Sequence, residues 1–312
     1  MATPADLRPV RMTVRATETL EGAGFPVRRP FPTRALEDLD PFLLLDEMGP
    51  TDAGPGEAKG APDHPHRGFE TVTYLLSGEV RHRDSHGGVG RIGPGDVQWM
   101  TAGDGVVHSE LPGERILAEG GRMHGFQLWV NLPGRHKRTP PRYQDLRAAT
   151  IPVVRTPDGL ATMRVIAGQA LGASAATRTF TPILYLHVSL APGGRLEQPV
   201  PPGWNAFAYV FSGRARVGRE ARLARSGELV VLHRKGGPVA IAAEPDGEGA
   251  EVLLAAGEPI GEPVARYGPF VMNTEQEIVQ AIADYRAGRM GEIQAEPLGR
   301  DAGGSGPGGA AP

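Results

Sequence analysis

The sequence contains no cysteine, so disulfides, thiolate nucleophiles and zinc–thiolate sites are excluded. Any redox chemistry must therefore come from a bound metal. No apolar run approaches the about 18 residues that a membrane-spanning helix needs, and the first residues, MATPADLRPVRMTVRA, have no apolar signal region. A formal net charge of −3 argues against a broad basic surface. We expect a cytoplasmic monomer that contacts neither membrane nor nucleic acid directly.

Glycine and proline are abundant instead, with 44 and 30 residues in a chain of 312. Without a collagen-like period, this density indicates many turns between short strands. Short apolar runs recur as far as Gly268, among them residues 71–76, 97–100, 126–130, 183–190, 207–211 and 229–232. The pattern predicts an all-β protein of the sandwich or barrel type, and its length allows two domains.

Breaks in this pattern suggest the domain limits. A proline-containing link of low apolar content at 132–142 divides the chain into predicted domains at 1–135 and 136–270. Thr274 and Glu277 form a capping box, and Gly288 provides a stop, so we predict a C-terminal helix within 271–290 that packs on the two domains. Residues 291–312 have little to bury, and we expect a disordered tail there.

An internal repeat relates the two predicted domains. The segment YLLSG at 74–78 recurs as YVFSG at 209–213, a shift of 135, and GDVQWM at 95–100 is echoed by GELVVL at 227–232, a shift of 132. Two matches in the same order at nearly equal shifts indicate a duplicated unit with a small insertion or deletion in a loop.

Four side chains in the first copy have the spacing of a metal site. His64 and His66 are two residues apart, and so are His108 and Glu110. On a β-strand this spacing places both side chains of a pair on one face. Two such strands could close a mononuclear site of three imidazoles and one carboxylate. In the second copy the corresponding positions hold Pro199, Pro201, Ala240 and Ala242, so the fold itself does not require these four residues.

The ligand types do not select one metal, because imidazole and carboxylate suit iron, manganese, cobalt, nickel, copper and zinc. An octahedral ion would keep two positions open for a substrate, water or dioxygen. Among the other histidines, His82 and His86 lie in a Gly/Asp-rich segment, and we expect them to be solvated. His124 begins an apolar run and either lines the cavity or is a satisfied core histidine.

The segment DHPHRGFE at 63–70, followed by an apolar run and Gly78, resembles the first motif of the cupins, and the stretch from Gly95 to His108 resembles the second. More specifically, the chain resembles the pirin family over about residues 15–290. The resemblance is carried by residues 39–43, 63–76, 95–103, 127–131 and 268–274. It implies two tandem jelly-roll barrels, of which only the first binds a metal.

The resemblance also implies a ligand set and a cofactor. One iron ion would be held in the first barrel by His64, His66, His108 and Glu110, although other divalent transition metals also suit these ligands. In many cupins the fourth ligand is the glutamate of the first motif, which here is Glu70. The pirin resemblance favours Glu110 and leaves Glu70 at the rim of the site or beside the ligands.

Two functions follow from the resemblance. Some pirin-like proteins are dioxygenases that open the central ring of quercetin. Here Glu110 would act as the catalytic base for such a small aromatic substrate, and apolar walls such as Val72, Leu76 or Phe126 would enclose its rings. Other family members are redox-sensing regulators that bind a transcription factor or a metabolic enzyme in a metal-dependent way. The sequence leaves both open, because the ligand set is the same in each.

Overall fold

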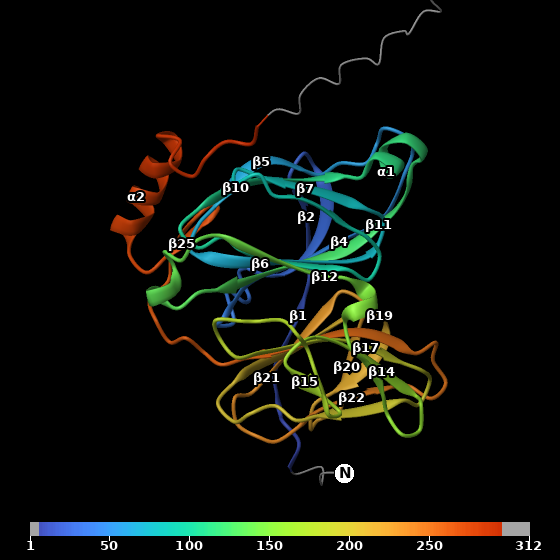
Figure 1. Ribbon diagram of the computed structural model, residues 1–312. Helices are drawn as coiled ribbons and strands as arrows, with labels where there is room; N and C mark the ends of the chain where they lie inside the picture. The colour runs from blue at the N-terminus through green and yellow to red at the C-terminus, as the bar shows by residue number, and fades with distance from the viewer. Residues whose placement is uncertain (1–5, 295–312) are drawn as a thin grey trace, which may run out of the picture.

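The computed structural model describes residues 6–294, which form two β-barrels, one above the other in Figure 1. The upper, first barrel has a seven-stranded and a four-stranded sheet. The lower, second barrel is built on one ten-stranded sheet, and two short hairpins, β15–β16 and β24–β25, complete the fold. The expected all-β architecture of two cupin barrels with a C-terminal helix is therefore confirmed.

The elements of the first barrel are β2 (Thr17–Glu21), β3 (Phe25–Phe31), β4 (Phe42–Ala53), β5 (Ala61–His66), β6 (Phe69–Ser77), β7 (Val80–Asp84), β8 (Val89–Ile92), β9 (Val97–Thr101), β10 (Val106–Pro112), α1 (Glu114–Glu119), β11 (Gly121–Asn131) and β12 (Arg142–Leu146). Those of the second are β1 (Val10–Arg15), β13 (Val153–Arg155), β14 (Ala161–Ala167), β17 (Ile183–Leu190), β18 (Arg195–Gln198), β19 (Asn205–Val217), β20 (Arg222–Arg225), β21 (Glu228–Leu232), β22 (Val239–Ala243) and β23 (Ala250–Gly257). The remaining elements are η2 (Gly134–His136), η3 (Ala148–Thr150), β15 (Gln169–Ala170), β16 (Ala173–Ser174), β24 (Ala265–Tyr267), β25 (Phe270–Met272) and α2 (Glu275–Arg286).

The internal repeat corresponds to equivalent strand pairs. In the first barrel β6 pairs with β9, and Tyr74 lies opposite Val97. In the second barrel β19 pairs with β21, and Tyr209 lies opposite Leu229. The two matches in the sequence thus fall on paired strands in the same register, which confirms that the barrels share one architecture.

The two barrels bury one continuous apolar core between them. Alternate residues of β6, Val72 and Tyr74, pack in the same cluster as Phe207 and Tyr209 of β19. Because side chains alternate along a strand, the opposite face of β6, which carries Thr73, points into the first barrel. The sheet that separates the barrels therefore has an apolar face towards its partner and a face available for a site.

The boundary between the barrels differs from the predicted division at 1–135 and 136–270. Strand β1, at the start of the chain, pairs with β21 of the second barrel, and β12 pairs with β9 of the first. Each supplies backbone partners to a strand that would otherwise be an unpaired sheet edge. Composition showed a weakly apolar link but could not show which sheet the flanking strands join.

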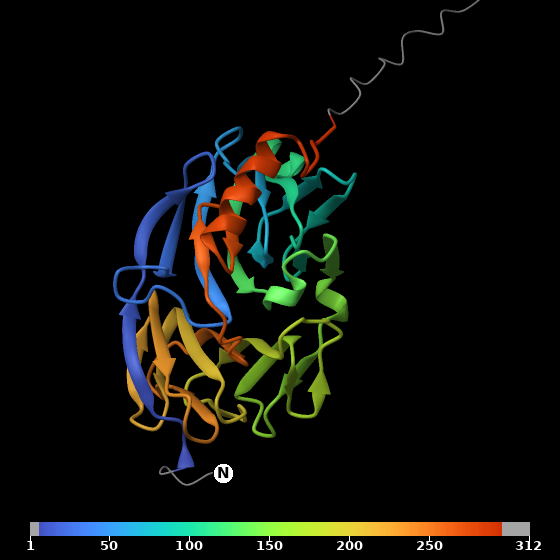
Figure 2. The same ribbon diagram turned by 90° about the vertical axis from the view of Figure 1, so that its left-hand side faces the viewer.

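The C-terminal segment returns to the first barrel. The predicted capping box is present, with the Thr274 side chain accepting from the Glu277 backbone N–H, and α2 follows it. The predicted helical region 271–290 therefore contains a shorter helix, preceded by β25. Ile278 and Ala281 pack with Val107 of β10, and Figure 2 shows α2 lying across the first barrel. Most of the predicted tail, residues 295–312, lies outside the described residues.

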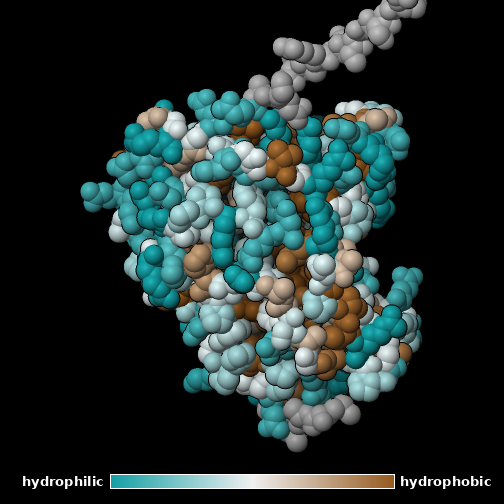
Figure 3. All heavy atoms as spheres, in the orientation of Figure 1, coloured by the Kyte–Doolittle hydropathy of each residue, from teal (hydrophilic) through white to brown (hydrophobic). Residues whose placement is uncertain are grey.

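Hydrophilic side chains cover most of the first barrel on the face seen in Figure 3, and apolar ones gather mainly over the second. Between residues 6 and 294 no helix is long and apolar enough to cross a membrane.

Candidate metal centre

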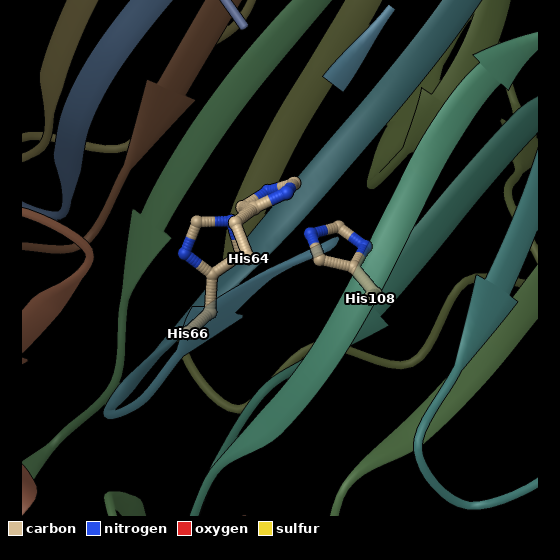
Figure 4. A group of neighbouring side chains, drawn as sticks. All are labelled: His64, His66 and His108. Atoms are coloured by element: carbon tan, nitrogen blue, oxygen red, sulfur yellow. The ribbon is translucent and has the colours of Figure 1, made fainter. Parts of the chain in front are cut away.

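Three of the predicted ligands converge inside the first barrel. His64 and His66 end β5, and β5 pairs with β10 so that His108 lies directly opposite His64. The three rings face one another in Figure 4, with ring centroids 4.3 to 4.9 Å apart. One nitrogen of each ring lies within 4.8 Å of the others. In the part of the chain that the structure describes, this is the one group of three or more such side chains close enough to share a metal ion.

The protonation and hydrogen bonding of these rings fit a metal. Burial lowers the pKa of His66 and His108 well below the usual value, so both are neutral at pH 7, the form that binds a metal. Both ring nitrogens of His108 are buried without a hydrogen-bond partner among the described residues. In contrast, Nδ1 of His64 lies 2.7 Å from the Pro62 carbonyl, which holds its Nε2 towards the other rings. A metal ion bound by one nitrogen of each ring would give His108 a partner for one of its two buried nitrogens.

Glu110 lies beside the three histidines but is not part of that group. The register of β10 shifts between His108 and Glu110, which lies opposite Ala61. The Glu110 carboxylate accepts a hydrogen bond from the Thr73 hydroxyl at 2.8 Å and lies 3.5 Å from Nε2 of Gln127. Its place as the fourth ligand therefore stays a prediction.

Glu70 does not approach the site. A turn at Gly68, whose φ of +88° suits glycine, separates β5 from β6 and breaks the alternation that seemed to put Glu70 on the face of His66. Glu70 shares its face of β6 with Val72, towards the second barrel, and is 1% exposed. Its Oε1 accepts a hydrogen bond of 2.7 Å from Thr101. The expectation that Glu70 lies at the rim of the site or beside the ligands is wrong.

Because Glu70 is buried, we expect the stability of the protein to depend on pH. Burial raises its pKa to about 7 from 4.5, against the opposing effect of the Thr101 hydrogen bond. The folded chain thus holds this proton more tightly than the unfolded chain, and stability falls as pH rises from about 4.5 through 7. A Glu70→Gln variant cannot ionise, so its stability relative to wild type should increase between pH 4.5 and pH 8 by about 1 to 3 kcal/mol.

Urea unfolding of the metal-free protein at the two pH values measures this difference. Glu248→Gln, at an exposed carboxyl, is the matched control and should show no such change. A difference between wild type and Glu70→Gln that is constant with pH would contradict a raised pKa.

His82 was expected to be solvated, and this is wrong. It is 2% exposed, its ring centroid lies 5.3 Å from that of His108 and 4.8 Å from that of Tyr143, and its Nε2 lies 3.7 Å from the Asp84 carboxylate. The signal in the sequence was the alternation of β7, where Val80, His82 and Asp84 all point inwards. His86, which follows β7, is exposed as expected.

Two cavities meet beside the histidines. The metal cavity, about 560 Å³, is lined by His64, His66, Gln127, Trp129, Arg29 and Arg266 among others. The apolar chamber, about 230 Å³, is lined by side chains that include Pro26, Leu75, Val80, Met123 and His124. Phe25, Met48, Ala61 and Glu110 line both.

The apolar walls differ from those predicted. Val72 and Phe126 belong to the core between the barrels, and Leu76 packs against that core. His124 lines the apolar chamber and is also partnered, because its Nε2 lies 3.0 Å from the buried Glu47 carboxylate. Sequence reasoning did not find Arg266, since it reaches the cavity from β24, which is distant in the chain from the histidine pair.

Comparisons with known proteins agree with this architecture. The family model "Pirin" matches residues 24–130, and the model "Pirin C-terminal cupin domain" matches residues 185–291. Pirin of Mus musculus is 43% identical over 92% of this chain and 95% of its own length. A pirin-like protein of Caulobacter vibrioides is 44% identical over 91% and 99%. The crystal structure of a quercetin 2,3-dioxygenase from Acinetobacter baumannii is 39% identical, with a TM-score of 0.86, over 92% of this chain and all of that one.

Proposed function

The chain belongs to the pirin family, and we propose that it is a metal-dependent dioxygenase acting on quercetin-like flavonols, with iron as its metal. The observation that carries the proposal is the convergence of three histidines, with orphaned buried nitrogens, on a cavity that adjoins an apolar chamber. The resemblance to a structure named quercetin 2,3-dioxygenase supports the substrate class.

A metal held by His64, His66, His108 and Glu110 would act as a Lewis acid towards the 3-oxygen of a flavonol. Glu110 is the base that takes the 3-hydroxyl proton, because its carboxylate lies at the wall shared by the two cavities. Thr73 and Gln127 orient that carboxylate. The apolar chamber, with Leu75, Val80 and Met123, receives an aromatic ring and excludes water from it.

Oxygen uptake tests the proposal. Protein loaded anaerobically with ferrous iron and then exposed to air should consume oxygen in the presence of quercetin, in proportion to the flavonol lost. Glu110→Gln keeps the size of the side chain and removes its basicity, so turnover should fall by about 100-fold or more. Glu70→Gln is the matched control, because it changes a buried acid on the opposite face of the sheet, and its turnover should be unchanged.

Two results would contradict the proposal. If iron-loaded protein takes up no oxygen with quercetin, the proposed dioxygenase function is wrong. If Glu110→Gln turns over quercetin at the wild-type rate, Glu110 is not the catalytic base, and the metal would activate the substrate without it.

A further inference from the structure

Arg266 lines the metal cavity. It belongs to β24, in the segment that returns from the second barrel to the first. Its guanidinium lies over the Trp129 ring, with Cζ 5.1 Å from the ring centroid, and Nη1 donates to the Leu43 carbonyl at 3.2 Å. The residue is exposed as a whole, and the bond to Leu43 uses one of its five N–H donors.

The other arginine that lines this cavity is already neutralised. Arg29 bonds both carboxylate oxygens of Asp46, at 2.7 and 2.6 Å, and also bonds Glu21 at 2.5 Å. For Arg266, no carboxylate within residues 6–294 lies within the 4.0 Å of an ion pair. Burial and the neighbouring Arg29 lower the pKa of Arg266, and the surrounding carboxylates raise it only from a longer range. Arg266 therefore presents a cation to the cavity without a contacting anion.

The Trp129 indole links this cation to the histidines. Its ring centroid lies 5.1 Å from that of His66 and 4.4 Å from that of Phe69. The guanidinium and the His66 ring therefore contact the same indole, so one substrate could span the distance between the cation and the metal centre. The contact with the Trp129 ring limits the positions of the guanidinium, whose planar donors suit two parallel hydrogen bonds to a carboxylate.

We propose that Arg266 is a specificity-determining residue that binds a carboxylate on aromatic substrates whose oxygen atoms reach the metal centre. This rests on the proposed function and adds to it a preference, among the aromatic substrates that reach the metal centre, for those that also carry a carboxylate. Arg266 Cζ and the His66 ring centroid each lie 5.1 Å from the centroid of the Trp129 ring, so the cation and the metal centre are close enough for one such substrate. A substrate carboxylate beside Arg266 would make charge-assisted hydrogen bonds to a guanidinium that contacts no carboxylate of the protein. Since the site is partly open to water, the gain in affinity is about five- to tenfold.

Two catechols that differ only in a carboxylate test the contribution of the substrate's negative charge to binding. Dihydrocaffeate and 4-ethylcatechol share the chelating ring and differ in the carboxylate. Their dissociation constants are measured without oxygen, on nickel(II)-loaded protein at low ionic strength, by calorimetry and by quenching of tryptophan fluorescence. Wild type should bind dihydrocaffeate five- to tenfold more tightly than 4-ethylcatechol, and Arg266→Gln should bind both nearly equally.

Two further variants separate charge from packing. Arg266→Lys keeps the charge but not the planar donors, and it should retain part of the preference. Arg222→Gln, at an exposed arginine of the second barrel, should leave the preference unchanged. Equal affinities in wild type, an undiminished preference in Arg266→Gln, or no binding of either catechol would overturn the proposal. The preference is measured without turnover, so its loss is distinguishable from a failure of oxygen uptake with quercetin.

Discussion

A His108→Ala variant should bind metal more than about 100-fold more weakly than wild type, and should show no oxygen uptake with quercetin. His108 is the one imidazole that β10 supplies, whereas His64 and His66 both come from β5, so its loss leaves two imidazoles and the proposed Glu110 carboxylate. Removing one of the three nitrogen donors weakens the site, because the ion must then take an additional water or buffer ligand in place of the imidazole. The measurement is elemental analysis after gel filtration, with titration calorimetry for the dissociation constant.

The variant should still fold, because it removes a ring whose two nitrogens have no hydrogen-bond partner and therefore gives up no protein contact of that kind. Metal should raise the thermal midpoint of wild type and leave that of His108→Ala unchanged, since only binding to the folded state stabilises it. His233→Ala, at an exposed histidine of the second barrel, is the control and should bind metal like wild type. A His108→Ala protein that keeps one metal per chain would exclude this centre.

Replacing Asp284 with alanine should destabilise the protein by about 3 kcal/mol, which is the usual cost of breaking a buried ion pair from one side. Asp284 of α2 accepts a hydrogen bond of 2.6 Å from Arg67, and the side chains of Arg67 and Asp284 are only 3% and 7% exposed. Arg289 and Gln280 bond the same carboxylate. The variant would leave the Arg67 guanidinium buried, with the Asp104 carboxylate 3.8 Å away.

The pH dependence of this effect has a defined sign. Burial alone would raise the pKa of Asp284, but hydrogen bonds from Arg67, Arg289 and Gln280 hold it well below its usual range. The carboxylate thus stabilises the fold above the pKa of the unfolded chain, about 4, and this contribution is lost as pH falls further. The difference between wild type and Asp284→Ala should be constant from pH 8 to pH 5 and shrink in stronger acid.

Urea unfolding gives the overall stability difference, and hydrogen exchange of the α2 amides shows whether the helix detaches first. Glu275→Gln changes an exposed carboxyl on the same helix and should cost well under about 1 kcal/mol. Equal stability of Asp284→Ala and wild type, with unchanged exchange in α2, would mean that Arg67 finds another partner.

Structural features that depend on a few neighbouring residues could be predicted from the sequence itself. The two-residue spacing of His64 and His66 places both rings on one face of β5, because strand side chains alternate whatever the rest of the chain does. Thr274 and Glu277 mark the start of α2 through bonds between residues close in the chain. The repeat located equivalent strand pairs, because both copies fold by the same local pattern.

Features that depend on distant parts of the chain were decided only by the tertiary structure. The turn at Gly68 moved Glu70 to the opposite face, and the pairing of β7 with β10 buried His82 beside His108. The return of the C-terminal segment brought Arg266 to the metal cavity and Asp284 to Arg67. Alternation and capping are properties of a few consecutive residues, so the sequence encodes them directly. The partner of an edge strand or a buried charge is chosen by the packing of the whole chain, which no local pattern contains.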